Sequence, residues 1–397
     1  MDTYFLNWLE LIFRWLHVIT GIAWIGASFY FIWLDNSLEE PPRWKIDNGV
    51  KGELWAVHGG GIYEVAKYRL GPAKMPETLH WFKWEAYSTW LTGMALLVLI
   101  FYVGADSYLI DPSISELSRT EAITYGISFI LGGWLVYELL CSTAVIRNGL
   151  AMALCLTLIA AITSWALTSL FSGRGAFIHL GAMIGTIMAG NVFRVIIPSQ
   201  RALVTAIETG TELDPAWGAK AKLRSTHNNY FTLPLLFIMI SNHYPMTYAH
   251  KHNWLVLLAL VVISAFARHF FNLRHRGVLR PSILITAAFA TGALAWAIIP
   301  VRTIPNTETA NAMSDRQVST LISTHCVACH ATQPTDPMFS AAPGGVALET
   351  ISDIKRWSIQ IRAVAVDSED MPMLNKTNMT SEEREMLGQW IEKTVSG

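Results

Sequence analysis

The chain has 397 residues, of which 52% are hydrophobic and only 15% charged, and its net charge at pH 7 is −1. Soluble domains carry about 25% charged residues, so this composition indicates a membrane protein, and the near-neutral charge gives no sign of nucleic-acid binding. Sixteen tryptophans suit the two aromatic belts of a membrane protein. The N-terminus lacks a basic segment followed by a short apolar run, so no cleavable signal peptide is expected.

Eight apolar stretches approach the length of about 20 residues that crosses a bilayer as a helix. They cover residues 6–33, 86–104, 122–141, 149–171, 175–197, 231–249, 253–271 and 282–300. The sixth contains Pro234 and polar side chains, and the fourth and fifth are separated by few residues, so seven spans is the alternative count.

Lys and Arg are distributed unevenly between alternate loops, with seventeen in one set and three in the other. Cytoplasmic loops carry the excess of positive charge in membrane proteins. The pattern predicts that both termini lie outside the cytoplasm, provided that the number of spans is even.

The loop at 34–85 is long enough that we expect a function or short helices within it. It contains His58 followed by three glycines, which would allow a close approach of backbone to a ligand or would only form a turn.

The composition changes after residue 300. Residues 301–315 are predicted to be a polar linker. Residues 316–397 have the composition of a soluble domain with short helices, and Thr380 and Glu383 predict a capping box at the start of the last one. A domain of about 80 residues buries only a small core, so a covalent cofactor would add needed stability.

The motif Cys326-Val327-Ala328-Cys329-His330 is C-x-x-C-H. Two thiols at this spacing attach haem through its vinyl groups, and the adjacent histidine is the proximal iron ligand. A zinc site would need further Cys or His ligands close by, and a thioredoxin-like dithiol would need a βαβ pattern. Neither is present, so the motif predicts one covalent c-type haem, which is attached on the outer side of bacterial membranes.

Met371 is the predicted second axial ligand of this haem, because Pro372 stiffens the segment beside it. Met373 is the rival, Met379 is a weaker candidate and Met338 is expected to pack. A thioether ligand raises the potential of a c-type haem and suits an electron acceptor.

Ionisable residues within the spans are costly and are functional candidates by default. His17, with Arg14 nearby, and His179 are predicted to lie at a similar depth in the outer half of the membrane. The two imidazoles could ligate a b-type haem, line a substrate pocket or only pack. His17, Arg14 and His179 are therefore the candidate catalytic residues.

Glu138, Asn191 and Arg194 form a second polar level near the inner ends of their spans. An ion pair between Glu138 and Arg194 is the simpler interpretation, and a path for a substrate anion or a proton is the alternative.

Residues 14–29, 55–63 and 80–85, together with Cys326–His330 and the segment Ala342-Pro343-Gly344-Gly345-Val346, resemble one family over nearly the whole chain. This combination resembles the bacterial membrane-bound urate oxidase (urate hydroxylase) that is linked to cytochrome c. Many cytochromes share C-x-x-C-H, so the membrane part discriminates.

The resemblance implies an all-α fold. Residues 1–300 would form a polytopic transmembrane bundle of about eight spans, and residues 316–397 a small class I-like cytochrome c domain. It places the chain in a bacterial inner membrane, as a multi-pass protein in the lipid bilayer with the cytochrome domain in the periplasm.

The resemblance also implies the reaction. Urate would be oxidised at C5 to 5-hydroxyisourate, the first step of purine-ring breakdown. The electrons would pass through the c haem to a periplasmic or membrane acceptor of the respiratory chain, either a soluble cytochrome c or a terminal oxidase. An arginine fork and aromatic faces would suit the planar urate anion; Arg14 with Trp15 and Trp24, or Arg194, could supply them.

Two other classes of function remain open on the sequence alone. The chain could be an electron-transfer subunit that takes electrons from quinol or a partner enzyme, without a small-molecule substrate of its own. It could also be a transporter fused to a redox sensor, although no paired, interrupted spans support that interpretation.

Overall fold

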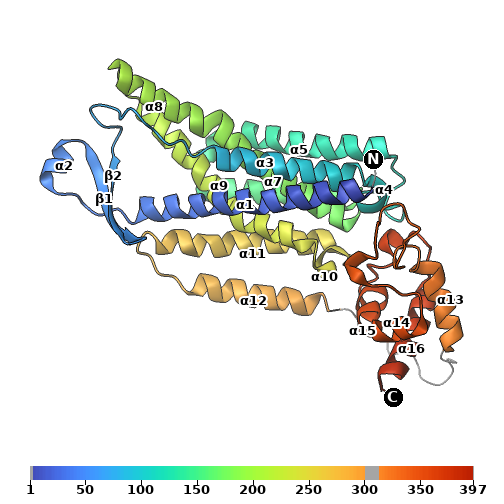
Figure 1. Cartoon of the computed structure of the whole chain (residues 1–397). Helices are drawn as coiled ribbons and strands as arrows, with labels where there is room; N and C mark the ends of the chain where they lie inside the picture. The colour runs from blue at the N-terminus through green and yellow to red at the C-terminus, as the bar shows by residue number, and fades with distance from the viewer. Residues whose placement is uncertain (1–2, 300–312, 397) are drawn as a thin grey trace.

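A computed structural model describes residues 3–299 and 313–396 of the chain (Figure 1). The first range forms a bundle of helices with one β-hairpin, called here the bundle. The second forms a small helical unit at one end of it, called here the C-terminal region. Residues 300–312, which make up most of the predicted linker, lie outside the described residues.

Six helices among the described residues are long and apolar enough to cross a membrane. They are α1 (Thr3–Asn36), α3 (Trp84–Leu96) with its π-helical extension η1 (Leu97–Tyr102), α5 (Arg119–Ser142), α6 (Gly149–Thr168), α7 (Gly173–Asn191) continued by η3 (Val192–Ile196) and α8 (Ile197–Thr209), and α11 (Asn253–Arg274). These helices indicate a multi-pass membrane protein and confirm six of the eight predicted spans.

The other two predicted spans are helices of a different kind. The sixth prediction was misplaced, because helix α9 runs over Pro215–Ser241 and begins well before the apolar stretch. α9 carries polar residues in its buried part, since Arg224, Asn228 and Asn229 are buried. The helix packs against α7 and α11. Helix α12 (Ser282–Ala297) is apolar but has 16 residues, fewer than the roughly 20 that span a bilayer.

The loop between α1 and α3, in which we expected a function or short helices, holds a β-hairpin and one short helix. Strand β1 (Val50–His58) pairs antiparallel with β2 (Gly61–Tyr68), and a single helical turn, α2 (Arg43–Asp47), precedes them. Gly59 and Gly60 form the two-residue turn with φ of 57° and 78°, values that favour glycine in a hairpin of this type. The glycines after His58 therefore form a turn.

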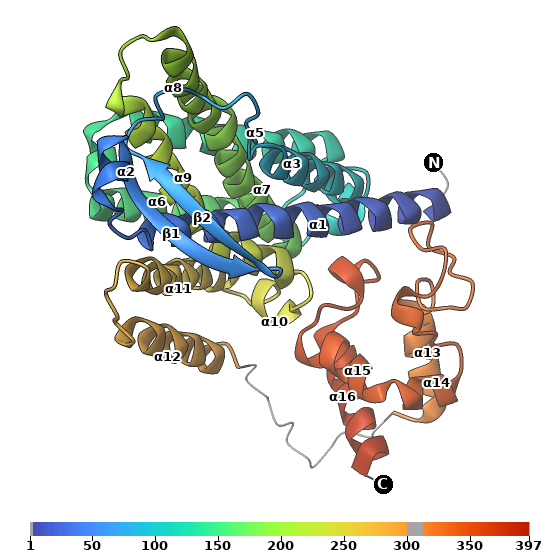
Figure 2. The same cartoon turned by 60° about the vertical axis from the view of Figure 1, so that its left-hand side comes forward.

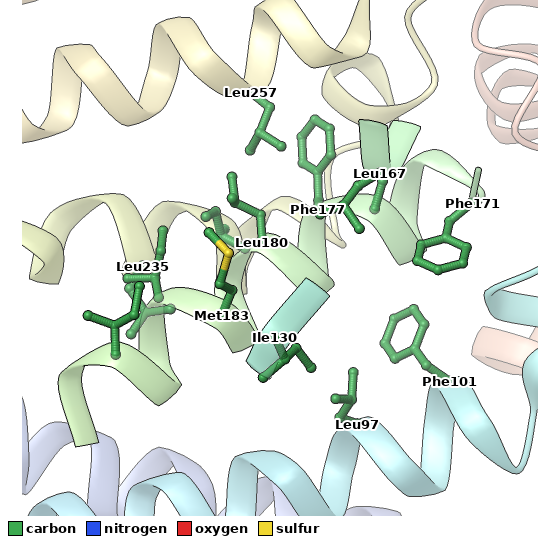
Figure 3. Packing of buried hydrophobic residues seen from close by; sticks show 14 of the residues in the cluster. Leu97, Phe101, Ile130, Leu167, Phe171, Phe177, Leu180, Met183, Leu235 and Leu257 are labelled. Carbon is green, nitrogen blue, oxygen red and sulfur yellow. The ribbon is translucent and has the colours of Figure 1, made fainter. Parts of the chain in front are cut away.

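The core of the bundle lies between its central helices. Apolar side chains of η1, α5, α6, α7, α9 and α11 converge there, and Figure 3 labels ten of them. Leu167, Phe171, Phe177 and Leu180 are fully buried. α7 contributes most to this core because it is enclosed by α5, α6 and α9. Short elements close the helix ends: α4 (Ala105–Tyr108), η2 (Ala144–Arg147) and α10 (Pro245–Tyr248).

The C-terminal region has a hydrophobic core of its own, built around Ile322, Leu387 and Trp390. Its elements are α13 (Asp315–His325), η4 (Pro343–Gly345), α14 (Ile351–Arg356), α15 (Ser358–Ile361), η5 (Arg362–Asp367), η6 (Met373–Asn375) and α16 (Ser381–Ser396). The predicted capping box is confirmed, since the Glu383 amide donates to Thr380 Oγ1 at 3.2 Å and the Thr380 amide donates to Glu383 Oε2 at 2.7 Å.

The two ends of the bundle differ in what they carry. The C-terminal region lies at the end where α1 begins, and the hairpin and α8 project from the opposite end (Figures 1 and 2). The segments that hold seventeen of the Lys and Arg residues counted above lie at the hairpin end, although Arg224 and Arg268 among them are buried within α9 and α11. The positive charge therefore gathers at the end away from the C-terminal region.

Candidate functional sites

The C-x-x-C-H motif forms one tight turn directly after α13. The His330 amide donates to the Cys326 carbonyl at 2.8 Å, and the Cys329 amide donates to the same oxygen at 3.2 Å. Both cysteines are free thiols, and Cys326 packs against the core of the C-terminal region. The turn therefore holds two unlinked thiols and an imidazole close together, as covalent attachment of a haem requires.

The ring of His330 is oriented by the backbone. Its Nδ1 lies 2.9 Å from the Val346 carbonyl oxygen. A carbonyl can only accept, so Nδ1 carries the proton and Nε2 of the neutral ring keeps its lone pair. This is the orientation that histidine ligands of metals use, with the second nitrogen held by a protein acceptor. The chemistry of the three side chains fits a c-type haem.

The same side chains fit the competing interpretations poorly. Burial raises the pKa of the Cys326 thiol to about 12, and burial together with Asp336 raises the pKa of the Cys329 thiol. A redox dithiol or a reactive cysteine has a lowered thiol pKa instead. Within the described ranges, no group of three or more His, Cys, Asp or Glu side chains could hold a metal ion, which a structural zinc site would need.

The methionine candidates occupy different environments. Met379 is buried in the core of the C-terminal region, and its amide donates to Asn375 Oδ1 at 2.9 Å. Met371 packs against the edge of the same core, and its backbone is held by Val364 and Arg384. Met338 lies against Gly104 of the bundle. Met371 stays the predicted axial ligand.

Polar contacts join the C-terminal region to the bundle beside Met371. Arg174 Nη2 donates to Tyr248 Oη at 2.7 Å, and Tyr248 Oη donates to Asp370 Oδ1 at 3.1 Å. Burial raises the pKa of Tyr248 to about 12, so its hydroxyl stays protonated. Lys376 Nζ donates to Ser107 Oγ at 2.7 Å. The segment 370–376 is thus anchored to the end of the bundle.

The candidate catalytic histidines do not share one site. His17 Nδ1 lies 3.0 Å from both the Thr89 carbonyl oxygen and Thr92 Oγ1, whereas His179 Nε2 lies 3.3 Å from Tyr102 Oη. Thr92 and Tyr102 are about ten residues apart on one continuous helix, or about 15 Å. The prediction of a similar depth was wrong, and the two rings do not face each other across one iron atom.

His179 is enclosed by protein groups. Its Nδ1 lies 2.8 Å from the Gly175 carbonyl oxygen, and the rings of Phe101 and Phe171 lie 6.3 Å and 5.1 Å from its own. A side chain at Gly126 would meet Nε2 at 2.5 Å. Arg14, the third candidate, forms an ion pair with Glu10 on the exposed side of α1. The structure therefore does not bring His17, Arg14 and His179 together.

The inner polar level is a buried network with a partner that the sequence did not suggest. Glu138 pairs with Arg224 of α9, at 2.9 Å and 3.1 Å between guanidinium nitrogens and carboxylate oxygens. Arg194 instead lies exposed over the ring of Trp134 at 5.3 Å, so the predicted pair with Glu138 was wrong. Arg224 also donates to Asn191 Oδ1 at 3.0 Å.

Sequence reasoning missed Arg224 because it assigned α9 before residue 231 to a polar loop. The signal was present: Arg224, Asn228 and Thr232 recur at a spacing of four residues and would share one helix face. Asn191 Nδ2 donates to Asn228 Oδ1 at 2.8 Å and to Tyr137 Oη at 2.9 Å. The network is satisfied within the protein, which is the arrangement of a structural element.

The bundle defines the class of protein as a multi-pass helical membrane protein that buries polar groups between its helices. The chain belongs to the urate oxidase N-terminal family, whose model matches residues 3–299. Comparisons with curated proteins and with solved structures find no match. The family match ends where the bundle ends, so urate oxidation is suggested for the bundle and the C-terminal region lies outside the matched range.

Proposed function

We propose that the bundle oxidises urate to 5-hydroxyisourate and that the C-terminal region accepts the electrons on a covalently bound c-type haem. The observation that carries this proposal is the combination of the family match over residues 3–299 with the turn Cys326–His330 in a region anchored to the bundle. Family membership supports urate as the substrate, and the motif supports the electron acceptor.

The reaction balances without dioxygen. Urate and one water give 5-hydroxyisourate, two protons and two electrons, so a C–O bond forms at C5 and the ring is oxidised. One haem accepts one electron at a time, so two transfers complete each turnover. Cys326 and Cys329 would hold the haem, His330 Nε2 would be the proximal ligand, and Met371 would be the distal one.

The anchoring contacts give the C-terminal region its position in this scheme. Asp370 is fixed by Tyr248 at 3.1 Å, directly before Met371. This contact keeps the proposed haem-binding segment against the end of the bundle. The electrons would leave to a soluble cytochrome c or a terminal oxidase on the same side of the membrane.

The charge distribution supports the orientation. The hairpin end carries the positive excess, which cytoplasmic loops show in membrane proteins. We propose that the hairpin end faces the cytoplasm of a bacterium and that the C-terminal region faces the periplasm, where haem attachment to C-x-x-C-H takes place.

Anaerobic addition of urate to the purified chain tests the function. We expect urate to reduce the haem. We also expect a pyridine haemochrome assay to give one covalent c-type haem per chain. Reduction by quinol but not by urate would favour the electron-transfer subunit instead. Cys329→Ala is expected to lose covalent haem and urate turnover together; turnover that persists with dioxygen as acceptor would contradict the proposed electron path.

A further inference from the structure

Arg268 is a buried cation in a membrane-spanning helix without an acidic partner. It lies on α11 about 9 Å from the end of that helix at the hairpin side, and only 4% of the residue is exposed. Among the described residues no carboxylate pairs with it, and its Nη2 has no hydrogen-bond partner. A buried, unpaired charge is strongly unfavourable unless something outside the chain completes it.

Arg268 lies in an open cavity lined mainly by aromatic rings. The cavity has a volume of about 490 Å³ between α1 and α11, and it is lined by Phe29, Tyr30, Trp33, Leu233, Phe271 and His275 together with Arg268. The guanidinium carbon of Arg268 lies 3.8 Å from the centre of the Phe29 ring. Ligand sites of proteins are cavities of about 300 to 1,000 Å³ with apolar walls and few polar groups.

Two buried amides beside Arg268 also have unsatisfied atoms. Arg268 Nε donates to Asn229 Oδ1 at 3.0 Å, which leaves Asn229 Nδ2 without a partner. Asn272 follows Arg268 by one helical turn, on the same face of α11, and its Oδ1 is unpartnered as well. Asn229 is 0% exposed and Asn272 is 7% exposed. Neither amide is among the residues that line the cavity, so both belong to the packing behind Arg268.

We propose that the cavity at Arg268 binds the substrate as a planar heteroaromatic anion, with Arg268 as its counter-ion. Arg268 supplies a positive charge and N–H donors for an anion, and the aromatic side chains supply flat apolar walls. Urate has a flat face for these walls, carbonyl oxygens that can accept from Arg268, and one negative charge. This assignment rests on the proposed function for the identity of the ligand.

A lipid phosphate fits the same groups less well. A phosphate has no flat face to lie against the rings of Phe29 and Phe271, which prefer planar partners. The positive excess at the hairpin end would attract any anion to this end of the bundle, and the lining selects among them.

Equilibrium binding of radiolabelled urate to the full haem-bearing chain in lipid nanodiscs tests the site. Arg268→Gln is expected to weaken urate binding by about 10- to 100-fold, because a hydrogen bond to a charged group is lost. Arg274→Gln removes the same charge from an exposed position of the same helix, and it should bind urate within about twofold of wild type.

A folding defect is controlled for by thermal melting without urate. Arg268→Gln should melt no lower than wild type, since it removes an uncompensated buried charge.

The outcomes also separate this site from the proposed function. If urate reduces the haem of the wild-type chain and Arg268→Gln binds urate as tightly as wild type does, the site assignment is overturned and the function stands. If urate binds through Arg268 but reduces no haem, the function is overturned and the site stands. An anionic phospholipid found by native mass spectrometry on wild type, absent from Arg268→Gln and not displaced by urate, would overturn the site assignment in favour of a lipid.

Discussion

The bundle buries two arginines near its hairpin end, and their surroundings are opposites. Arg224 donates to both carboxylate oxygens of Glu138 and to Asn191, and it stacks over the Tyr137 ring at 5.0 Å. Arg268 has one amide partner, Asn229, and no acid. Groups of the protein pair with the guanidinium of Arg224, whereas the guanidinium of Arg268 keeps one nitrogen without a hydrogen-bond partner. Burial alone therefore does not distinguish a structural arginine from one that binds a ligand. The distinction is whether the guanidinium nitrogens have hydrogen-bond partners within the protein.

Breaking the Arg224 network should produce the largest effect on stability. Arg224→Leu leaves Glu138 without its cation and Asn191 without a donor to its Oδ1, so we expect a loss of about 3 to 5 kcal/mol in the free energy of unfolding. Thermal or denaturant unfolding in detergent measures this loss. Arg268→Gln is the matched control and should lie within about 1 kcal/mol of wild type or above it. Equal destabilisation by both would remove the distinction between the two arginines.

Removing both members of the pair sharpens the comparison. The double variant Glu138→Leu with Arg224→Leu leaves no buried charge at this position, so it should recover about 2 kcal/mol relative to Arg224→Leu alone. A double-mutant cycle on unfolding free energies measures the coupling. Strictly additive losses would mean that Glu138 is paired with water rather than with Arg224.

The hydroxyl of Tyr137 links this pair to a histidine. Tyr137 Oη accepts from Asn191 Nδ2 and is hydrogen-bonded to His227 Nδ1, each at 2.9 Å. Tyr137→Phe removes both bonds while keeping the ring under Arg224, so we expect a loss of about 1 to 2 kcal/mol and no change in urate affinity. A large loss of urate affinity in this variant would instead place the substrate in the Arg224 network.

The sequence predicted the parts of this molecule that depend on local pattern. Six spans followed from apolar length, and the capping box at Thr380 followed from residue spacing. The partners of Glu138 and the state of Arg268 depend on which helix faces which, and no local pattern fixes that. α9 illustrates the difficulty, because its buried polar residues make a core helix look like a loop.

The hairpin and the different depths of His17 and His179 were not predicted, for related reasons. The two strands that flank Gly59 were not predicted, because the alternation of β1 and β2 is partly hidden where both faces are largely exposed. The depth of His17 was counted from the apolar stretch, whereas α1 begins at Thr3 and carries His17 further from its end. The motif predicts His330 as the proximal haem ligand. It does not predict that the Val346 carbonyl accepts the hydrogen bond from His330 Nδ1.

A third arginine, Arg174, stands between the two cases, because its partners lie across the contact with the C-terminal region. Its guanidinium donates to Tyr248 and lies 3.9 Å from Asp370. Asp370→Ala should slow haem reduction by urate by about two- to tenfold, in proportion to one lost hydrogen bond at the contact. Reduction by dithionite, which does not need the bundle, should be unchanged. Glu392→Gln, which disrupts only the contact with Arg362 within the C-terminal region, is the control. A wild-type rate of urate-driven reduction in Asp370→Ala would show that the anchoring of the C-terminal region does not limit electron transfer.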